Sequence, residues 1–355
     1  MFNGRICLTN LCGKMKYDVT IGIPVYNSVS CIRTSLMSAL SQSYSSIEFI
    51  LVNDCCTDGT FDVIGYILSS HERSNDVRIL TNFQKQGVSY SRNLIIDEAQ
   101  GEYLYFMDSD DTIAKNAIEL LMLNARKFDA EIVFGSYEKI ETSGKKTVYQ
   151  YPSKQLLGKD ELASFSYRKY AGIQASVCNT IVKTDVIRFN HHRFIDVNYW
   201  EDLVFTFDLV TLVSRAVLLP DITYIYICRE NSLSHYQERI NISKAEVMQN
   251  AEAIECLKRT STLMSDKTYY SNRCYNIAMT DFYIACAILK RRKTIIPYIT
   301  NSEIKAIMSH PATWHQICSF RRSRFKNQLL YILSKMPSFL CVFIIMCIGR
   351  MKKLI

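Results

Sequence analysis

The sequence predicts an α/β protein built on a doubly wound, mostly parallel sheet. Two observations carry this prediction. Apolar runs of strand length alternate with segments of helical periodicity between residues 18 and 107, and polar loops follow the strands. The chain has 355 residues, of which 48% are hydrophobic and 21% charged, and this is typical of a globular protein with about two domains.

The elements of the first part alternate without interruption. Residues 18–25 form an apolar run that ends in a Pro-containing turn, and Ile32, Leu36 and Leu40 recur behind it at helical spacing. The next apolar run is closed by a loop rich in Asn, Asp and Gly. In order, the sequence predicts strand 18–25, helix 30–42, strand 47–52, helix 61–70, strand 77–80, helix 88–99 and strand 103–107.

The second part is less regular, and neither an internal repeat nor a low-complexity linker divides it. Helical periodicity dominates its C-terminal end. In order, we expect helix 114–127, strand 130–135, an irregular polar stretch over 136–158, helix 199–213, short strands 217–219 and 223–227, and helices from 240 to 290.

The formal net charge of +8 is concentrated near the C-terminal end. Nine Lys and Arg residues and no acidic residue follow Glu303, so the preceding residues are nearly neutral. The 13 cysteines are odd in number and include no Cys-x-x-Cys pair, and residues 1–16 hold no apolar signal segment. We therefore expect reduced thiols and a cytoplasmic protein, with Met1 and Met15 both open as its start.

An acidic cluster follows the strand predicted over 103–107. Asp108, Asp110 and Asp111 bring three carboxylates into four residues, and their mutual repulsion requires a compensating positive charge. Mg²⁺ or Mn²⁺ can supply it, since these ions take one or two carboxylates and fill their other positions with water and phosphate oxygens. A solvated turn or a helix N-cap is the alternative.

Polar side chains gather in other loops of the predicted sheet. Tyr26 can stack on a nucleotide base, Asp54 can accept an N–H from it, and Arg92 offers a planar fork for a carbonyl or phosphate. Each has a structural alternative: Pro24 and Asn27 as turn formers, Asp54 as a helix cap, and Arg92 in a surface salt bridge. Their order on successive elements favours one shared binding crevice.

Five segments of the chain resemble the family 2 glycosyltransferases with the GT-A fold. They are 19–27 (Val-Thr-Ile-Gly-Ile-Pro-Val-Tyr-Asn), 41–44 (Ser-Gln-Ser-Tyr), 48–60 (Glu-Phe-Ile-Leu-Val-Asn-Asp-Cys-Cys-Thr-Asp-Gly-Thr), 87–93 (Gly-Val-Ser-Tyr-Ser-Arg-Asn) and 101–111 (Gly-Glu-Tyr-Leu-Tyr-Phe-Met-Asp-Ser-Asp-Asp). The resemblance is dense over residues 17–112 and extends more loosely to 235. It implies a Rossmann-like GT-A fold and inverting transfer of a sugar from a nucleotide-sugar, most commonly a UDP-sugar, to an acceptor hydroxyl.

The resemblance also implies roles for individual residues. By motif position, the nucleotide-sugar would be bound by Pro24, Tyr26, Asn27, Asp54, Arg92, Asp108 and Ser109. Asp108 and Asp110 would form the DxD pair that holds Mn²⁺ or Mg²⁺. Asn53 departs from the family's usual Asp-Asp pair at positions 53–54, and this puts the packing of that loop in doubt.

Inverting transfer needs a carboxylate that takes the proton of the acceptor hydroxyl. Glu201 and Asp202 begin an apolar helix and resemble the family's Glu-Asp motif, so Asp202 is the predicted base and Glu201 would orient the acceptor or the helix end. Trp200 could pack on a sugar face. The alternative is two acids that complement the helix macrodipole. The diphosphate or the acceptor could also be contacted by Arg229, Ser232 and His235. The alternative is that these are edge-strand and turn residues.

The most apolar run of the chain, 337–349, lies within the basic C-terminal segment. It is shorter than the ~20 residues that a membrane-spanning helix needs. Apolar residues among basic ones suit attachment to an anionic membrane surface, and a final core helix is the alternative. A nucleic-acid partner is not predicted, because the charge accompanies apolar runs and the rest of the chain is neutral.

We therefore predict an extension (1–16), a GT-A domain (17–235), a helical region (236–303) and a basic, membrane-associating tail (304–355). The predicted function is that of a hexosyl- or N-acetylhexosaminyl-transferase of surface polysaccharide biosynthesis. It would be peripheral at the inner face of the cell membrane and use a glycan or lipid-linked acceptor. A sugar nucleotidyltransferase of related fold and a non-catalytic nucleotide-sugar-binding protein are the alternatives. The sequence specifies neither donor sugar, linkage nor oligomeric state.

Overall fold

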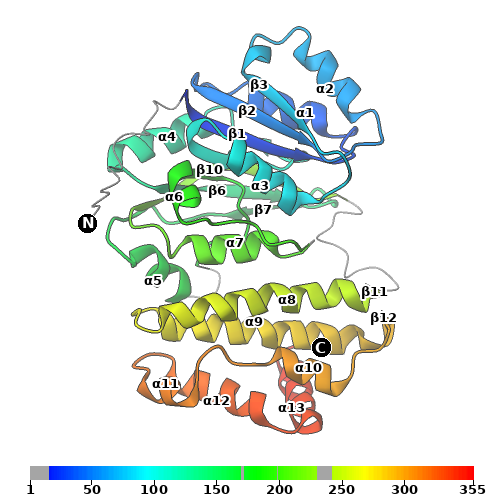
Figure 1. Ribbon diagram of the computed structural model, residues 1–355, viewed down its shortest axis with the longest axis vertical. Helices are drawn as coiled ribbons and strands as arrows, with labels where there is room; N and C mark the ends of the chain where they lie inside the picture. Colours follow the sequence, from blue (N-terminus) through cyan, green and yellow to red (C-terminus); the bar gives the residue numbers. More distant parts are fainter. Residues whose placement is uncertain (1–15, 169–171, 198, 230–241) are drawn as a thin grey trace, which may run out of the picture.

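A mixed sheet forms the N-terminal part of the protein, and helices flank it and extend beyond it (Figure 1). The computed structural model describes residues 16–168, 172–197, 199–229 and 242–355. The predicted N-terminal extension, apart from Lys16, lies outside these residues. Within them the fold is the predicted α/β architecture followed by a helical C-terminal region.

Most of the strands belong to one sheet. The strands are β1 (Tyr17–Val25), β2 (Ile47–Asn53), β3 (Val77–Thr81), β4 (Gly101–Phe106), β5 (Thr112–Ile113), β6 (Ile132–Ile140), β7 (Lys146–Tyr149), β8 (Lys154–Leu156), β9 (Thr180–Lys183), β10 (Ala216–Ile227), β11 (Ile242–Ser243) and β12 (Ile295–Ile296). In the described part of the chain the large sheet has the order β3-β2-β1-β4-β9-β6-β10-β5, with β7 paired to β6 and β8 to β10, while β11 pairs with β12.

Helices follow most strands and make up the C-terminal region. The α-helices are α1 (Ile32–Leu40), α2 (Thr60–Leu68), α3 (Val88–Glu98), α4 (Ala117–Phe128), α5 (Glu161–Arg168), α6 (Thr184–Phe189), α7 (Glu201–Leu209), α8 (Lys244–Ser261), α9 (Tyr270–Arg291), α10 (Asn301–Ile307), α11 (Trp314–Ser319), α12 (Arg324–Lys335) and α13 (Ser338–Met351). Short 3₁₀ turns are η1 (Ser74–Asp76), η3 (Thr262–Met264) and η4 (Arg292–Thr294).

The strands β3, β2, β1 and β4 are parallel, as the alternation of strands and helices predicts. The middle of β1 and nearly all of β2 are buried, because both faces of these mostly apolar strands are covered. The buried carboxylate of Glu48 accepts a hydrogen bond from Thr20 Oγ1 at 2.8 Å. The strand order reverses at β1, which has β2 on one side and β4 on the other. In open α/β sheets, ligands bind at the carboxyl edge beside such a reversal, and the acidic cluster follows β4 at this edge.

The other half of the sheet corrects two predictions. The stretch 136–158, predicted to be irregular, contains the end of β6, the strand β7 that folds back on it, and β8. The turn at Gly144 allows this hairpin, since glycine adopts the required positive φ of 81°. The strands predicted over 217–219 and 223–227 are a single strand, β10, whose register against β6 shifts around Pro220.

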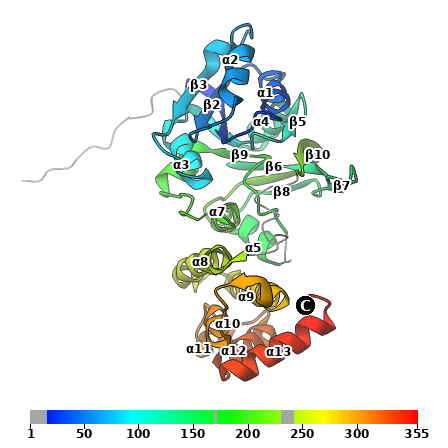
Figure 2. The same cartoon turned by 90° about the vertical axis from the view of Figure 1, so that its right-hand side faces the viewer.

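The helices α8 and α9 lie between the sheet and the last four helices in both views of the molecule (Figures 1 and 2). They contact the sheet domain through α7 and α5, respectively. Apolar residues from α8, α9, α10 and α13 form a second core, separate from the core of the sheet. The predicted helical region therefore packs directly on the part of the chain that carries the predicted catalytic acids.

A buried arginine strengthens this contact. Arg273 of α9 is fully buried and forms an ion pair with Asp208 of α7. The same guanidinium donates hydrogen bonds to Tyr167 Oη of α5 at 2.6 Å and to Ser261 Oγ of α8 at 2.8 Å. Four helices thus meet at one buried charge, and α7, which begins with the predicted catalytic acids, is held by it.

The apolar run 337–349 lies almost wholly in α13. Its residues Cys341, Val342, Ile345 and Gly349 are buried, so one side of this helix belongs to the second core. Throughout the described ranges, every helix is too short or too polar to cross a bilayer.

Candidate active site

The turns after β1 and β4 meet at the carboxyl edge of the sheet. The hydroxyl oxygens of Ser28 and Ser109 lie 2.7 Å apart and both side chains are buried. Ser35 Oγ on α1 donates to the main-chain carbonyl of Asp108 at 3.3 Å. These contacts fix the predicted nucleotide-binding turn and the acidic cluster relative to each other.

The turn after β1 exposes the aromatic ring that the sequence predicts as a base-stacking group. The ammonium of Lys85 lies 3.7 Å from the ring centroid of Tyr26, a cation–π contact. Asn27 has a left-handed backbone (φ 46°), and its Oδ1 accepts the N–H of Thr57 at 2.8 Å. This hydrogen bond joins the turn to the loop after β2. Pro24 lies within β1, in register with β2.

Asp54 organises the loop that leads into α3. Its buried carboxylate accepts hydrogen bonds from Asn82 Nδ2 at 2.8 Å and from the backbone N–H groups of Gln86 and Gly87 at 2.7 and 2.8 Å. Three partners are enough to keep this carboxylate in one orientation beside the nucleotide-binding turn. Its contact with a base stays a prediction.

Arg92 connects two acidic segments that are far apart in the sequence. Its Nη2 donates to Asp108 Oδ1 at 2.9 Å and its Nη1 donates to Glu201 Oε1 at 2.8 Å, and the guanidinium is buried. Burial opposes the charge of Arg92, but the carboxylates of Asp108 and Glu201 outweigh it and raise the pKa of the guanidinium. The end of β4 and the start of α7 are therefore joined by a permanent cation.

The three aspartates after β4 have different hydrogen-bond and ion-pair partners. Each of them, Asp108, Asp110 and Asp111, has one carboxylate oxygen that lies within 4.8 Å of such an oxygen of the other two. Asp111 serves the fold, since it accepts the hydroxyl of Tyr224 at 2.7 Å and the N–H of Ile227 at 2.8 Å, both on β10. Burial and the neighbouring charges of Asp108 and Asp110 raise the pKa of Asp111.

Asp110 pairs with Arg229, which follows β10, and Arg229 Nε lies 3.0 Å from Asp110 Oδ2. Burial and the charge of Asp108 raise the pKa of Asp110, and Arg229 opposes the rise. The site thus already holds a positive charge beside Asp110. Asp108 and Asp110 offer carboxylate oxygens, the donors that Mn²⁺ and Mg²⁺ prefer, so these residues fit a divalent cation.

The predicted catalytic acids begin α7. Trp200 has a left-handed backbone (φ 66°), which is uncommon for a bulky residue and explains why α7 begins after it rather than at 199. Glu201 faces Arg92, whereas Asp202 lines a cavity and accepts the N–H of Leu203 at 2.7 Å. Burial, and then the charge of Glu201, raises the pKa of Asp202 to about 7. Such a carboxylate suits proton abstraction near neutral pH.

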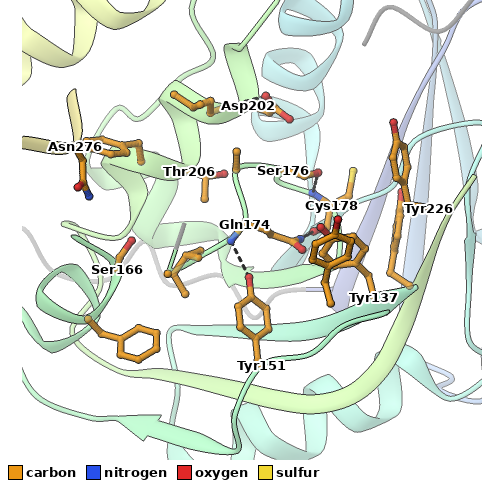
Figure 3. A pocket seen from close by; sticks show the side chains of 18 of the residues that line it. Tyr137, Tyr151, Ser166, Gln174, Ser176, Cys178, Asp202, Thr206, Tyr226 and Asn276 are labelled. Atoms are coloured by element: carbon orange, nitrogen blue, oxygen red, sulfur yellow. Dashed lines mark hydrogen bonds between the residues drawn. The ribbon is translucent and has the colours of Figure 1, made fainter. Parts of the chain in front are cut away.

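Asp202 and Asp108 line the same cavity, whose volume is about 930 Å³. Figure 3 shows Asp202 among the side chains that line it. Its walls come from the sheet, the loop after β7, residues 172–176 and the helices α5, α7, α8 and α9, and they include Tyr137, Tyr151, Gln174, Tyr226, Asn276 and Thr280. Tyr137 stacks on Tyr149 with ring centroids 4.8 Å apart, and the N–H of Gln174 donates to the hydroxyl of Tyr151 at 2.9 Å. Aromatic faces beside amide and hydroxyl groups can bind the faces and hydroxyls of sugar rings.

Sequence reasoning missed most of the cavity wall. Tyr137 and Tyr149 lie in the stretch predicted to be irregular, although two strand-like runs around the Gly144 turn were a hairpin signal. Asn276 is on a helix that received no predicted site role, and nothing in its local sequence places it at the cavity. Of the predicted contacts after β10, Arg229 lies at Asp110, while Ser232 and His235 lie outside the described residues.

The fold and the order of the loops at its carboxyl edge are those of a glycosyltransferase. A model of the family described as Glycosyl transferase family 2 matches residues 20–188. Residues 20–188 therefore form a family 2 glycosyltransferase domain, as the motifs of this part of the chain predict.

Two related sequences illustrate the family. Glycosyltransferase GlyG of Streptococcus pneumoniae is 28% identical over 221 residues, which are 61% of this chain and 72% of GlyG. WfgD of Escherichia coli, described as a UDP-Glc:alpha-D-GlcNAc-diphosphoundecaprenol beta-1,3-glucosyltransferase, is 30% identical over 128 residues, which are 36% of this chain and 48% of WfgD. Both are glycosyltransferases by name.

Solved structures support the fold. Residues 1–349 of TarS from S. aureus superpose with a TM-score of 0.52 at 17% identity, covering 90% of each chain. The mannosyltransferase PcManGT from Pyrobaculum calidifontis, solved with GDP-Man and Mn²⁺, gives a TM-score of 0.52 at 14% identity and covers 90% of this chain and 86% of its own. These likenesses establish the predicted GT-A fold.

Proposed function

We propose that this glycosyltransferase transfers a sugar, with inversion at the anomeric carbon, from a nucleotide-sugar to a hydroxyl group of a glycan or lipid-linked acceptor. One observation carries the proposal. Arg92 joins Asp108, the first acid of the DxD pair, to Glu201, and both Asp108 and Asp202 line one cavity. A donor diphosphate at the acidic cluster and an acceptor beside Asp202 would therefore share one space.

The reaction follows from this arrangement. Asp202 takes the proton of the acceptor hydroxyl as its oxygen attacks the anomeric carbon from the face opposite the diphosphate. The bond between the anomeric carbon and the diphosphate oxygen breaks, and its electron pair leaves with the nucleoside diphosphate. Asp202 then returns the proton to solvent. Arg92 keeps Glu201 and Asp108 in position on either side of the reacting centre.

The donor would bind at the carboxyl edge of the parallel strands β3, β2, β1 and β4. Asp108 and Asp110 would hold Mn²⁺ or Mg²⁺, which supplies positive charge for the leaving diphosphate when it is bound. The nucleotide and diphosphate would contact Pro24, Tyr26, Asn27, Asp54, Ser109 and Arg229, with Ser232 and His235 as further candidates and Trp200 on the acceptor side. Residues 17–235 would form this donor domain, and the helical region 236–303 would complete the acceptor side.

We further propose a UDP-sugar donor and a role in surface polysaccharide biosynthesis. The name of WfgD gives UDP-glucose as donor and a diphosphoundecaprenol-linked sugar as acceptor, and this chain is 30% identical to WfgD over 128 residues. Such an acceptor lies in a membrane, so the enzyme would work as a peripheral protein at the inner face of the cell membrane, in contact through residues 304–355.

A donor panel tests this function. The purified protein is given Mn²⁺ or Mg²⁺, one of several UDP-, GDP- or dTDP-sugars and a membrane extract as acceptor source, and the release of nucleoside diphosphate is measured. We expect metal-dependent release from one donor that is lost in Asp110→Ala. Metal-dependent donor binding without release, even with membrane extract, would overturn the proposal in favour of a protein that only binds nucleotide-sugars.

The pH dependence of the reaction should report Asp202. The base works only when it is ionised, and its pKa is raised to about 7 by burial and by Glu201. We therefore expect kcat/KM to rise with pH, by about tenfold per pH unit below the pKa, and to level off above it. In Glu201→Gln the midpoint should move to lower pH, because a neighbouring negative charge is lost. A midpoint that stays in place would show that another group titrates.

The ion pair between Arg229 and Asp110 predicts competition with the metal. Arg229 is about one-third exposed, so its pairing is weak, within about 1 kcal/mol. In Arg229→Gln without donor, Mn²⁺ should bind up to about fivefold more tightly, as measured by calorimetry. Arg215→Gln, a change at an arginine that pairs with Asp129 on the surface, serves as the control. An unchanged Kd for Mn²⁺ in Arg229→Gln would contradict the prediction.

A further inference from the structure

The last two helices turn apolar side chains away from the rest of the protein. On α12, Phe325, Leu329 and Ile332 are 70%, 52% and 44% exposed, and on α13, Phe339 and Phe343 are 67% and 61% exposed. Spacings of three and four residues put each set on one side of its helix. Both helices pack on α9, and their buried residues form the opposite sides.

Five large apolar side chains are thus exposed on two consecutive helices. Large exposed apolar patches on soluble proteins mark contact with a partner or a membrane. Figures 1 and 2 show α12 and α13 at the end of the molecule farthest from the strands β1, β2 and β3. They pack on α9, α10 and α11, and the side chains named above remain exposed among the described residues. The surface is therefore open to a large, flat partner.

The charged residues on these two helices and on the segments that flank them in the sequence are all basic. After Glu303 the sequence has no acidic residue. The exposed basic residues on and beside the two helices are Arg321, Arg322, Arg324, Lys326, Lys335, Arg350, Lys352 and Lys353. A partner that fits this face must offer apolar material to the phenylalanines and negative charge to their surroundings.

Charge also decides between the candidate partners. A second copy of the chain that docked through the same face would bring two identical basic borders together, and their repulsion would oppose the contact. An anionic bilayer offers both required features, since its headgroups are negative and its acyl region is apolar.

We propose that α12 and α13 form a monotopic membrane-binding face for anionic phospholipid. Phe325, Phe339 and Phe343 would enter the boundary between headgroups and acyl chains, and the basic residues would contact the headgroups. This proposal rests on the proposed function, because an enzyme with a lipid-linked acceptor must meet that acceptor at a bilayer. It specifies which part of residues 304–355 makes the contact.

Vesicle flotation of the full chain tests the proposal. The protein should float with vesicles of phosphatidylglycerol and phosphatidylcholine, and binding should fall with added salt and be weak to phosphatidylcholine alone. The double variants Phe339→Gln/Phe343→Gln and Lys352→Glu/Lys353→Glu should each lower the partition coefficient at least about tenfold. Each variant should keep the far-UV circular dichroism and melting temperature of the wild type, since the changed side chains are exposed.

Matched controls change similar side chains elsewhere. Phe189→Gln alters a phenylalanine on α6 that is 78% exposed, and Lys145→Glu/Lys159→Glu reverses two exposed lysines near the sheet. Both should bind vesicles as the wild type does. Equal losses in controls and test variants would overturn the proposal, because binding would then depend on net charge or hydrophobicity alone.

Two other outcomes would also overturn it. One is absence of vesicle binding by the wild type. The other is a dimer in analytical ultracentrifugation that Phe339→Gln/Phe343→Gln dissociates, which would assign the face to a second copy. Nucleoside diphosphate release in the donor panel is scored separately, so release without vesicle binding refutes only the membrane face, and vesicle binding without release refutes only the proposed function.

Discussion

Replacing Asp202 by asparagine is expected to lower kcat by about 10²–10⁴-fold and to leave donor affinity nearly unchanged. Asparagine keeps the size of the side chain and can still accept the N–H of Leu203, but it cannot take a proton from the acceptor. Steady-state release of nucleoside diphosphate gives kcat, and calorimetry with the donor gives Kd.

Asp221→Asn is the matched control, because Asp221 is exposed on β10 and lies away from the cavity lining. It should keep the kcat of the wild type. If Asp202→Asn also keeps it, Asp202 is not the base. If donor affinity falls in parallel with kcat, the role of Asp202 is in binding rather than in proton transfer.

Replacing Arg273 by methionine is expected to lower the free energy of unfolding by about 3–5 kcal/mol. The change leaves Asp208 without its ion-pair partner in a largely buried place and removes the hydrogen bonds to Tyr167 and Ser261. Urea unfolding followed by circular dichroism measures the loss. Because α7 and α9 meet at this residue, we expect catalysis to fall as well at urea concentrations that leave the wild type folded.

Lys146→Met is the matched control for the loss of a cation. Lys146 pairs with Glu138 at 2.9 Å, but its side chain is 61% exposed, so the change should cost less than about 1 kcal/mol. The double variant Arg273→Met/Asp208→Asn should be more stable than Arg273→Met, since it no longer buries an unpaired charge. Equal small losses in Arg273→Met and Lys146→Met would show that the buried network contributes little.

The parallel half of the sheet could be predicted because its signals are local. The apolar runs of β1 and β2, the helical spacing behind them and the polar loops at their ends all lie within a few residues of the features they specify. The acidic cluster and the Glu201-Asp202 pair were also local signals, and the structure brings their segments together. Whether those residues act as predicted awaits the experiments above.

The remaining features depend on contacts between distant segments. Arg92 meets Glu201 across 109 positions of the sequence, and no pattern around either residue predicts the pair. The strand β9 has only four residues, and its place between β4 and β6 depends on pairing with strands far away in the sequence. The hairpin of β6 and β7 has a turn signal at Gly144, but its strands lack a buried apolar run there, because β7 and the end of β6 are exposed or only partly buried. The pKa of Asp202 depends on burial, which only the folded chain determines.

The cavity wall contributed by α8 and α9 has a consequence for engineering. Leu257, Asn276, Ile277 and Thr280 border the space that Asp202 also lines. A chimera that keeps the N-terminal domain and takes its helices from another family member would thus exchange part of the cavity that we propose as the acceptor site. Acceptor choice should then follow the parent that supplies the helices, and successful exchange would require the new helices to carry a partner for Asp208.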